Sequence, residues 1–370
     1  MYINYYIFSI IILLGIVLGI SDSRKNRKIF ILIISAVLIL QTSLRSLSVG
    51  SDTPVYYRMF YNVMHKSWNK IWDEFVGRYL YHTSENDAGY VIMQKTIATF
   101  TDNWQVFVFL ANLLFFIPLG RLLYRYSTSM IQLVFAFVLY VSMFHIISLS
   151  GGRQLYAIGM SIMAFIYMDE RKYKRSLFFV FIGTLIHMTC LLSLLPILLS
   201  RLNAKYLKII HLISIVLVPF VILFANEIIF LMGSTVGVDK YARYGMSEVQ
   251  GGAWTFIGLL LLVSVFCFFV LTKKELKSNA SIANLYTMLP LFTLLGPLIY
   301  SNGTMIRISM YFHLYLMLLI PIAVNSYFKE RHQTAVFNIL IVILIILSLR
   351  DGGLYYRFFW EEPHLFIYSS

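Results

Sequence analysis

The chain has 370 residues, of which 59% are hydrophobic and only 13% are charged. Water-soluble domains hold about 25% charged and about 45–50% apolar residues. These proportions exclude a soluble enzyme, a secreted disulfide-stabilised domain and a disordered chain, and they indicate an integral membrane protein. The net charge of +13 does not by itself indicate a nucleic-acid partner, because lysine and arginine also flank membrane spans.

Eleven apolar runs have about the length that a helix needs to cross the hydrocarbon core. We therefore predict an all-α, polytopic membrane helix bundle with about ten or eleven transmembrane helices. The runs are Tyr2–Ile20, Ile29–Leu44, Trp104–Gly120, Ile131–Leu149, Leu155–Met168, Leu177–Leu199, Ile209–Met232, Trp254–Leu271, Ile282–Tyr300, Met305–Tyr327 and Ala335–Leu349. We expect residues 1–350 to form a single bundle and residues 351–370 to form a short tail on the outer side.

The distribution of basic residues predicts the orientation. Eighteen of the 30 lysines and arginines lie in short loops, which marks these loops as cytoplasmic. The loops are 21–28, 121–129, 170–175, 201–208, 273–280 and 329–333. In the first run the positive charges follow the apolar core, so we interpret it as a retained helix with its N-terminus outside and not as a cleaved signal peptide.

One pair of basic loops conflicts with simple alternation. Both 170–175 and 201–208 are predicted to be cytoplasmic, although a single apolar run, Leu177–Leu199, separates them. This run either enters the membrane and returns as a broken hairpin, with His187 near its midpoint and Pro196 in its second limb, or it is one ordinary span that violates the charge rule. Irregular backbone at membrane depth requires surrounding protein or a water-filled cavity.

Of the outer connections, only the loop 45–103 is large enough to hold structure outside the bilayer. The loop 45–103 is rich in tyrosine and tryptophan, and apolar residues recur at helical spacing from Val91 to Phe100, so we expect amphipathic helices that lie along the interface. Its aromatic residues are typical of interfacial anchors, and they are also suited to stacking on sugar rings. The loop 233–253 contains Tyr241 and Tyr244 among glycines and serines, a composition typical of a mobile loop.

Two arginines at the outer ends of helices are candidates for binding an anion. Arg153 follows Gly151 and Gly152 at the start of an apolar run, where free backbone N–H groups and a guanidinium together favour phosphate. Arg307 starts a later run, with Tyr311 one turn deeper. Arginine binds phosphate oxygens bidentately. The alternative for each is an arginine that extends from a helix end to the interface.

Two further residues are candidates for proton transfer. Asp52 is the only acid near the exit of the second run, and it is either a general base, an orienting partner for Arg45, or simply a helix cap in Asp52-Thr53-Pro54. His187 is either a general base or a packing residue with a polar partner. Glu85 and Asp87 form an external acid pair of the kind that can hold a divalent cation, but so short a pattern is weak, and we predict neither a metal nor a cofactor.

In combination, these segments resemble the EpsG family of Wzy-like bacterial polysaccharide polymerases, from about residue 30 to residue 330. The segments that carry the resemblance are Arg45 with Gly50-Ser51-Asp52-Thr53 and Tyr56-Tyr57, Asp87-Ala88-Gly89-Tyr90, Arg153-Gln154-Leu155-Tyr156-Ala157, Arg171-Lys172, Ile186-His187-Met188-Thr189 with Pro196, and Arg307-Ile308-Ser309-Met310-Tyr311-Phe312 with Ile320-Pro321. One departure is Asp87, where the family pattern leads us to expect glutamate; the acid is kept.

The resemblance implies a polymerase of the bacterial inner membrane with its active site on the outer face. Such an enzyme transfers a growing glycan from undecaprenyl diphosphate to the next lipid-linked repeat unit, in the synthesis of exopolysaccharide, capsule or O-antigen. Its substrates would be undecaprenyl diphosphate-linked oligosaccharides among membrane lipids, and a flippase and a chain-length regulator would be partners in the same pathway.

The resemblance also suggests roles for the candidate residues. Arg153 and Arg307 would stabilise the diphosphate leaving group, Asp52 or His187 would accept the proton of the attacking hydroxyl, and Arg45 would orient Asp52 or bind a second diphosphate. Sugars would be held by tyrosines, which are Tyr56, Tyr57, Tyr156, Tyr241, Tyr244 and Tyr311.

Three alternatives remain open. A glycan ligase or a lipid-phosphosugar-dependent glycosyltransferase would share the membrane bundle and the outer active site but add a single unit. A transporter or flippase of lipid-linked oligosaccharides would show an inverted repeat and charges at the membrane midplane. The sequence shows no repeat and its informative charges lie at the outer ends of helices, which favours an enzyme over a transporter.

Overall fold

The structure is a computed structural model that describes residues 2–81, 87–236, 243–246, 248–249, 251–272, 276, 279–349 and 355–366. Across these residues the chain is all-α, with two isolated β-bridges and no strand, which confirms the predicted fold class. Within this part seven helices are long and apolar enough to span a membrane, or eight if the bent pair Gly303–His313 and Leu316–Tyr327 forms one span. This is fewer than the predicted ten or eleven transmembrane helices. Helices α1 and α10 have only 17 and 14 residues, and α9, with 18 residues, is not among the spanning helices either.

The chain divides into two compact units, the first formed by residues 1–191 and 331–370 and the second by residues 192–330. The helices of the first unit are α1 (Ile3–Gly19), α2 (Arg24–Ser43), α3 (Thr53–Met64), α4 (Trp68–Tyr79), α5 (Ala88–Ala98), α6 (Trp104–Tyr126), α7 (Met130–Leu139), the π-helix η1 (Tyr140–Phe144), α8 (His145–Ser150), α9 (Gly152–Asp169), α10 (Tyr173–Ile186), α21 (Glu330–Leu349), η5 (Phe359–Glu361) and η6 (Pro363–Phe366). The 3-10 helix η2 (Met188–Ser193) crosses the boundary between the units.

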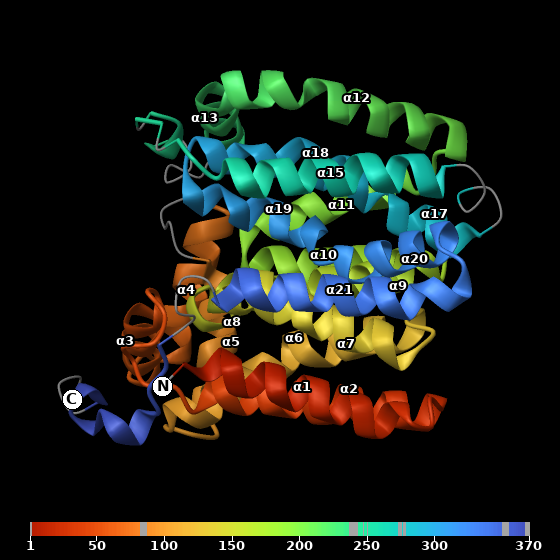
Figure 1. The fold of residues 1–370 in the computed structure, drawn as a ribbon. Coiled ribbons are helices and arrows are strands. Elements are labelled where there is room, and N and C mark those ends of the chain that lie inside the picture. Colours follow the sequence, from red (N-terminus) through yellow and green to blue (C-terminus); the bar gives the residue numbers. More distant parts are fainter. Residues whose placement is uncertain are drawn as a thin grey trace. The chain divides into compact units, whose positions relative to one another are not determined.

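The core of the first unit is built on α6. This helix packs against both α2 and α9, and α9 packs in turn against α10 (Figure 1). The N-terminus of α6 is capped by Asn103, whose side chain accepts a hydrogen bond from the backbone N–H of Val106. The buried face of α6 includes Phe107, Ala111 and Phe115, spaced at i, i+4 and i+8 as an amphipathic helix requires.

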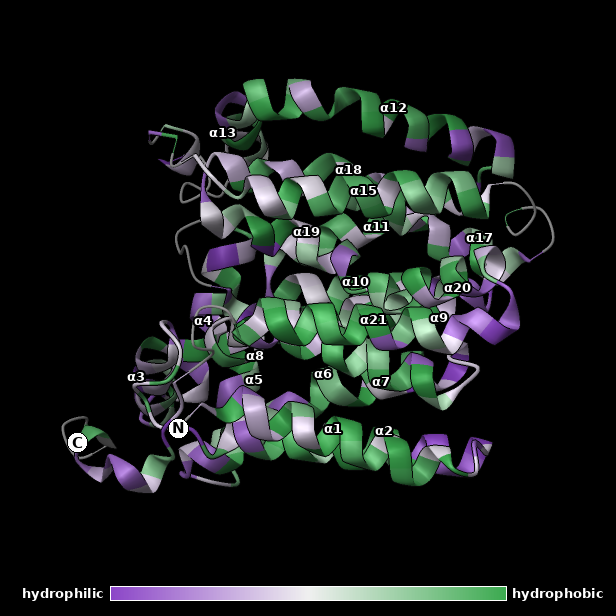
Figure 2. Ribbon diagram, in the orientation of Figure 1, coloured by the Kyte–Doolittle hydropathy of each residue, from purple (hydrophilic) through white to green (hydrophobic). Residues whose placement is uncertain are grey.

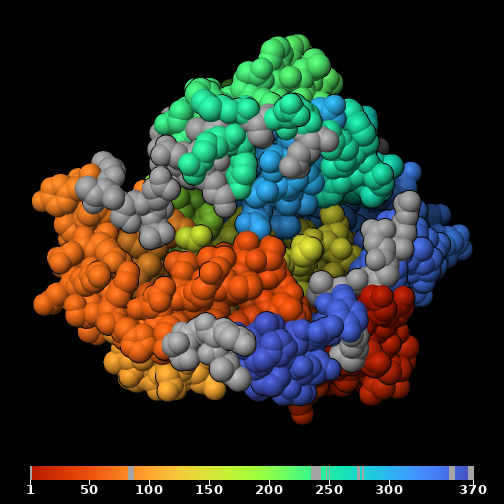
Figure 3. All heavy atoms as spheres, turned by 90° about the vertical axis from the view of Figure 1, so that its left-hand side faces the viewer, coloured from red at the N-terminus to blue at the C-terminus, as the bar shows by residue number. Residues whose placement is uncertain are grey.

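The predicted amphipathic helices of the outer loop are present as α3, α4 and α5. They gather at the end of the first unit where α2 terminates at Ser43 (Figure 1). The C-terminal segment lies beside the start of this loop, since Phe358 forms an antiparallel bridge with Arg45. Figure 3 views this face directly and shows the C-terminal segment against the orange residues of the outer loop.

The run Leu177–Leu199 does not form one continuous helix. Helix α10 ends at Ile186, and His187 takes up an extended backbone conformation (φ −155°, ψ 118°) before η2 begins. The following helix, α11 (Leu194–Leu199), belongs to the second unit. The break precedes the boundary between the two units, which falls within η2, and the choice between a hairpin and a single span stays open.

The second unit is also helical. Its elements are α11, α12 (Ala204–Leu223), α13 (Ala225–Val236), α15 (Trp254–Leu271), α17 (Ala280–Tyr286), α18 (Met288–Leu295), η3 (Gly296–Tyr300), η4 (Gly303–Met305), α19 (Ile306–His313) and α20 (Leu316–Tyr327). Hydrophobic residues dominate the long helices of both units (Figure 2). Many of them are exposed, as in Val216 of α12 and Leu262 of α15, which are 63% and 65% accessible. Exposed apolar helix faces of this kind are suited to contact with lipid.

Candidate functional site

The turn between α2 and α3 is packed against the end of α8, and this contact positions the start of α3. Gly50 has φ +92°, and a Cβ atom at this position would lie 2.0 Å from the carbonyl oxygen of Leu149 at the end of α8. Only glycine fits such a position. The Thr53 hydroxyl links the same elements, because its oxygen lies within hydrogen-bond distance of the carbonyl oxygens of Val49 (2.8 Å) and Leu149 (3.0 Å), and its one proton can be shared between them. The start of α3 is thereby held beside the segment that leads into Gly151, Gly152 and Arg153.

Arg45 precedes this turn in the chain, and only 4% of its surface is accessible. Its Nε donates to the Thr53 hydroxyl (3.3 Å), and Nη1 donates to the carbonyl oxygen of Thr42. Its side-chain hydrogen bonds therefore do not go to Asp52. Burial lowers the pKa of Arg45, and nearby tyrosine hydroxyls oppose that effect. The tyrosines are Tyr56, Tyr90, Tyr156 and Tyr356.

Arg153 occupies a more open position at the start of α9. Its Nη1 donates to the Asp87 carboxylate (3.1 Å), and the two side chains are 26% and 17% accessible. The guanidinium also stands over the rings of Tyr56 and Tyr90, at 5.6 and 5.8 Å from their centroids. Cation–aromatic contacts of this kind are worth about 0.5–2 kcal/mol. Among the residues that the structure describes, the buried Arg153 Nε has no hydrogen-bond partner.

Asp87 precedes α5 and is positioned by the end of α10. A Cβ atom on Gly89 would lie 2.5 Å from the carbonyl oxygen of Leu185, so the two helices approach closely there. The backbone N–H of Met188 lies near the Asp87 carboxylate. Burial raises the pKa of Asp87, while Arg153, Arg78 and the Met188 N–H act in the opposite direction. The result is a carboxyl group that titrates nearer to neutrality than an ordinary aspartate.

Tyr56, Tyr90 and Tyr156 join the two arginines into one cluster. The Tyr90 ring contacts Tyr56 edge-on (5.8 Å between centroids) and stacks with Tyr156 (6.4 Å). Tyr90 lies close enough to both Arg45 and Arg153 that each lowers its pKa, although burial raises that pKa overall. Four predicted site residues, Arg45, Tyr56, Arg153 and Tyr156, are therefore brought together.

Three residues of this cluster were not among the predicted site residues. They are Asp87, Tyr90 and Gln94, whose side-chain nitrogen approaches the Tyr90 hydroxyl at 3.3 Å. Tyr90 and Gln94 stand four residues apart on α5 and so share one face of the helix. A polar pair on an otherwise apolar face, directly after an acid at the helix start, was the available signal.

The other predicted residues of the first unit lie at the edge of the cluster. Asp52 occupies the N-cap position of α3 but makes no capping hydrogen bond, and the Ser51 hydroxyl contacts its Oδ1 at 3.4 Å. Tyr57 packs edge-on against Trp104 (5.6 Å between centroids). The Nδ1 of His187 is hydrogen-bonded to the Thr189 hydroxyl (2.7 Å). His187 is the residue before Met188, whose N–H contacts Asp87.

The remaining predicted residues belong to the second unit. Arg307 lies in the first turn of α19 and is half-buried, and Tyr311, one turn further, is 1% accessible. Tyr244 packs against the hydrophobic cluster that includes Ala225 and Leu298. Tyr241 lies outside the described residues, as does Glu85 of the acid pair. Of that pair, the structure describes only Asp87, which binds Arg153.

The cluster around Arg153 offers a chemistry suited to anions. Arginine carries five N–H donors, and Asp87 uses one Nη group of Arg153 while the side chain remains partly accessible. The tyrosine rings hold the guanidinium without neutralising it. An anionic group can therefore bind to a cation whose orientation is already fixed, next to a carboxyl group with a raised pKa.

Comparison with known proteins identifies the family. The model of the EpsG family matches residues 28–351, which is most of the 370-residue chain, and the chain therefore belongs to this family. No curated protein and no solved structure matches it. Membership implies a polysaccharide polymerase-like role in a multi-pass membrane protein.

Proposed function

We propose that this member of the EpsG family is a polysaccharide polymerase of the bacterial inner membrane. It transfers a growing glycan from undecaprenyl diphosphate to a lipid-linked repeat unit on the outer face of the membrane. The observation that carries the proposal is Arg153, a partly accessible arginine fixed by Asp87 and by two tyrosine rings. The leaving group of this reaction is a diphosphate, which needs cations as its charge develops.

In the proposed reaction, Arg153 binds the diphosphate of the donor lipid. Charge-assisted hydrogen bonds from a guanidinium to phosphate oxygens are among the strongest available in proteins. Because Asp87 and the rings of Tyr56 and Tyr90 already hold the guanidinium, little conformational entropy is lost when the diphosphate binds. Arg307 would serve a lipid-linked diphosphate in the same way from the start of α19.

The acceptor sugar must lose a proton when its hydroxyl attacks the anomeric carbon. Asp52 and His187 are the general bases suggested by the sequence. The carboxyl group of Asp87 is a third group at the same end of the first unit that could accept a proton. We assign Asp87 the positioning of Arg153, because its carboxylate is bound to that side chain, and we keep Asp52 and His187 as the candidate bases. Accessible aromatic residues of the outer loop, such as Trp68 and Trp72, would hold sugars or anchor the loop in the interface.

The test is complementation of a deletion strain, with surface glycan analysed on gels. Arg153→Ala is expected to abolish the ladder of long chains while one lipid-linked repeat unit is retained, a loss of about 100-fold or more in polymerisation. Arg175→Ala is the matched control, since Arg175 also lies over a tyrosine ring (5.8 Å from Tyr167) but at the opposite end of α9 and α10. A full ladder from Arg153→Ala at normal protein level would overturn the proposal, and a single added unit in the wild type would indicate a ligase.

A further inference from the structure

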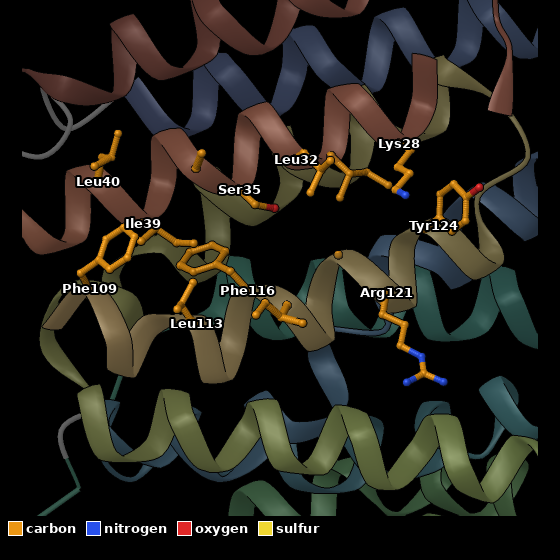
Figure 4. A pocket seen from close by; sticks show the side chains of 14 residues that line it. Lys28, Leu32, Ser35, Ile39, Leu40, Phe109, Leu113, Phe116, Arg121 and Tyr124 are labelled. Carbon is orange, nitrogen blue, oxygen red and sulfur yellow. The ribbon is translucent and has the colours of Figure 1, made fainter. Parts of the chain in front are cut away.

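An apolar groove runs between α2 and α6 (Figure 4), and none of the residues that line it belongs to the candidate site. Its volume is about 560 Å³, which lies within the range of about 300–1,000 Å³ typical of small-molecule sites. The lining residues are Lys28, Ile31, Leu32, Ser35, Ala36, Ile39, Leu40, Phe109, Leu113, Phe116, Ile117, Gly120, Arg121 and Tyr124. Both helices are of spanning length, and Leu32 and Ile117 of the groove wall are 58% and 62% accessible, so in a membrane the groove would be open to the hydrocarbon region.

The groove changes character towards the start of α2. Over the turns that carry Leu32, Ala36 and Leu40 its wall is apolar, whereas Lys28, Arg121 and Tyr124 line its other end (Figure 4). Along the apolar part, Ser35 is 8% accessible, and within the described residues its hydroxyl has no hydrogen-bond partner. An unsatisfied buried hydroxyl in an otherwise apolar groove is suited to a ligand that carries a polar group, such as an ester, near its chain.

A second, polar pocket adjoins this end of the groove, and Tyr124 lines both. It has a volume of about 390 Å³ and is lined by Arg24, Arg27, Leu123, Tyr124, Arg125, Ser127, Thr128 and Leu133. The Arg24 guanidinium stands over the Tyr124 ring at 5.1 Å. Within the described ranges, no carboxylate lines the groove or the pocket. The apolar groove therefore adjoins a pocket whose charged lining residues are all basic.

The basic side chains around this pocket are only partly neutralised. Arg27 pairs with Asp22 (3.2 Å), and Arg125 pairs with Asp169 (2.9 Å) and Glu170 (2.7 Å). Arg24 and Lys28 form no ion pair within the described part of the chain, and both are exposed. They stand four residues apart, on one face of the first turns of α2. These two cations are therefore available to an anionic headgroup.

We propose that the groove and the basic pocket together bind one phospholipid with an anionic headgroup. One acyl chain lies along the apolar wall between α2 and α6, and the phosphate is bound by Arg24 and Lys28. Basic pockets between membrane helices on the cytoplasmic side are sites of anionic lipid headgroups. A lipid is favoured over a protein partner because the apolar wall lies between two helices of spanning length and ends at basic side chains.

This lipid would act at a distance from the proposed chemistry. Helix α2 has 20 residues, so its Arg24 end lies about 30 Å from the Ser43 end beside Arg45. The bound lipid would hold α2 against α6, the helix on which the first unit is built. The proposal is independent of the proposed function, since it would hold for a membrane protein of any activity.

The test measures lipid binding to the purified full chain in detergent, by native mass spectrometry with phosphatidylglycerol and with phosphatidylcholine. Phosphatidylglycerol is expected to bind at least about tenfold more tightly, because each basic residue near a headgroup contributes a several-fold effect. In the double variant Arg24→Gln/Lys28→Gln that preference is lost. Lys25→Gln is the matched control, since Lys25 lies on the same turn but lines neither cavity.

A second variant tests the acyl chain. Ala36→Phe places a ring in the groove and is expected to weaken phosphatidylglycerol binding by about tenfold, whereas Ile33→Phe, on an exposed face outside the groove, leaves it unchanged. Equal binding of the two lipids, an equal effect of the control variants, or preferential binding of undecaprenyl phosphate over phosphatidylglycerol would each overturn the proposal. Elution as a single folded species in size-exclusion chromatography is required of every variant.

Discussion

Each unit contains a cluster of polar side chains among apolar helices, around Arg153 in the first unit and around His211 in the second. The two clusters differ in the hydrogen-bond partners of these side chains. In the second unit, His211 is hydrogen-bonded to the Tyr286 hydroxyl and to Ser264 (2.7 Å), and Ser264 is hydrogen-bonded to Thr293 (2.7 Å). These four residues are fully inaccessible. Every member of this network has a neutral partner.

The cluster of the first unit is charged and incompletely satisfied. Arg153 and Asp87 are both partly accessible, and the Arg153 Nε has no partner among the described residues. A network of neutral groups that satisfy one another stabilises helix packing. An ion pair with spare donors at the end of a helix has a higher energetic cost and indicates a role beyond packing. Histidine at membrane depth is thus not sufficient to mark a functional site.

Among the substitutions that separate these two clusters, the largest effect should come from Asp87, the partner of Arg153. Asp87→Ala removes the carboxylate that orients Arg153, and displacement of a positioning contact can cost about 100-fold in rate. We expect the long glycan chains to be lost in complemented cells, with normal protein level. Asp102→Ala, at an exposed position before α6, is the control. If Asp87→Ala made as much long-chain polymer as the wild type, the charged cluster would have no more functional role than the neutral one.

An intermediate effect is expected in the second unit, on stability and not on activity. His211→Phe removes the hydrogen-bond partner of Tyr286 and one of the two partners of Ser264, and interhelical hydrogen bonds in membranes contribute about 0.5–2 kcal/mol each. The variant should therefore unfold at a lower denaturant concentration, while polymer made per folded molecule is unchanged. His332→Phe, at an exposed position of α21, should change neither. Loss of polymer at wild-type stability would show that the neutral network takes part in the reaction.

The smallest effect concerns pH. Burial raises the pKa of Asp87 and Arg78 lowers it, so Arg78→Gln should raise it further. Since Asp87 holds Arg153 as a carboxylate, polymerisation falls as the pH drops through this pKa. The pH of half-maximal activity in membrane vesicles should therefore be higher in Arg78→Gln than in the wild type, by less than about one unit. A shift to lower pH would contradict the assignment.

Much of the fold could be predicted because it depends on local composition. Apolar runs predicted the spans, and helical spacing from Val91 to Phe100 predicted α5 at Ala88–Ala98. The break at His187 was also visible, through two basic loops on either side of one run. The short helices α1 and α10 made the number of spans uncertain, because apolar composition alone does not show where a helix ends.

The candidate site could be predicted only in part. Arg45 and Arg153 were identified because charges near membrane helices are rare. Their partners were not, because the ion pair between Arg153 and Asp87 joins residues 66 positions apart. Asp52 looked like the partner of Arg45 by proximity in sequence, whereas the Arg45 guanidinium binds Thr53 and Thr42 instead. Which side chains meet across helices depends on packing that one sequence does not reveal.

The C-terminal segment has a consequence for biogenesis. Residues 355–366 pack against the start of the outer loop. The Tyr356 hydroxyl donates to the Gln41 carbonyl oxygen (2.5 Å), and the Glu362 carboxylate accepts a hydrogen bond from the Ser46 hydroxyl (2.5 Å). Glu362 leaves the ribosome 316 residues after Ser46, when nearly all the helices have been made. The environment of Arg45 is therefore completed late, and a partly synthesised chain would already lie in the membrane with this end of its first unit still open.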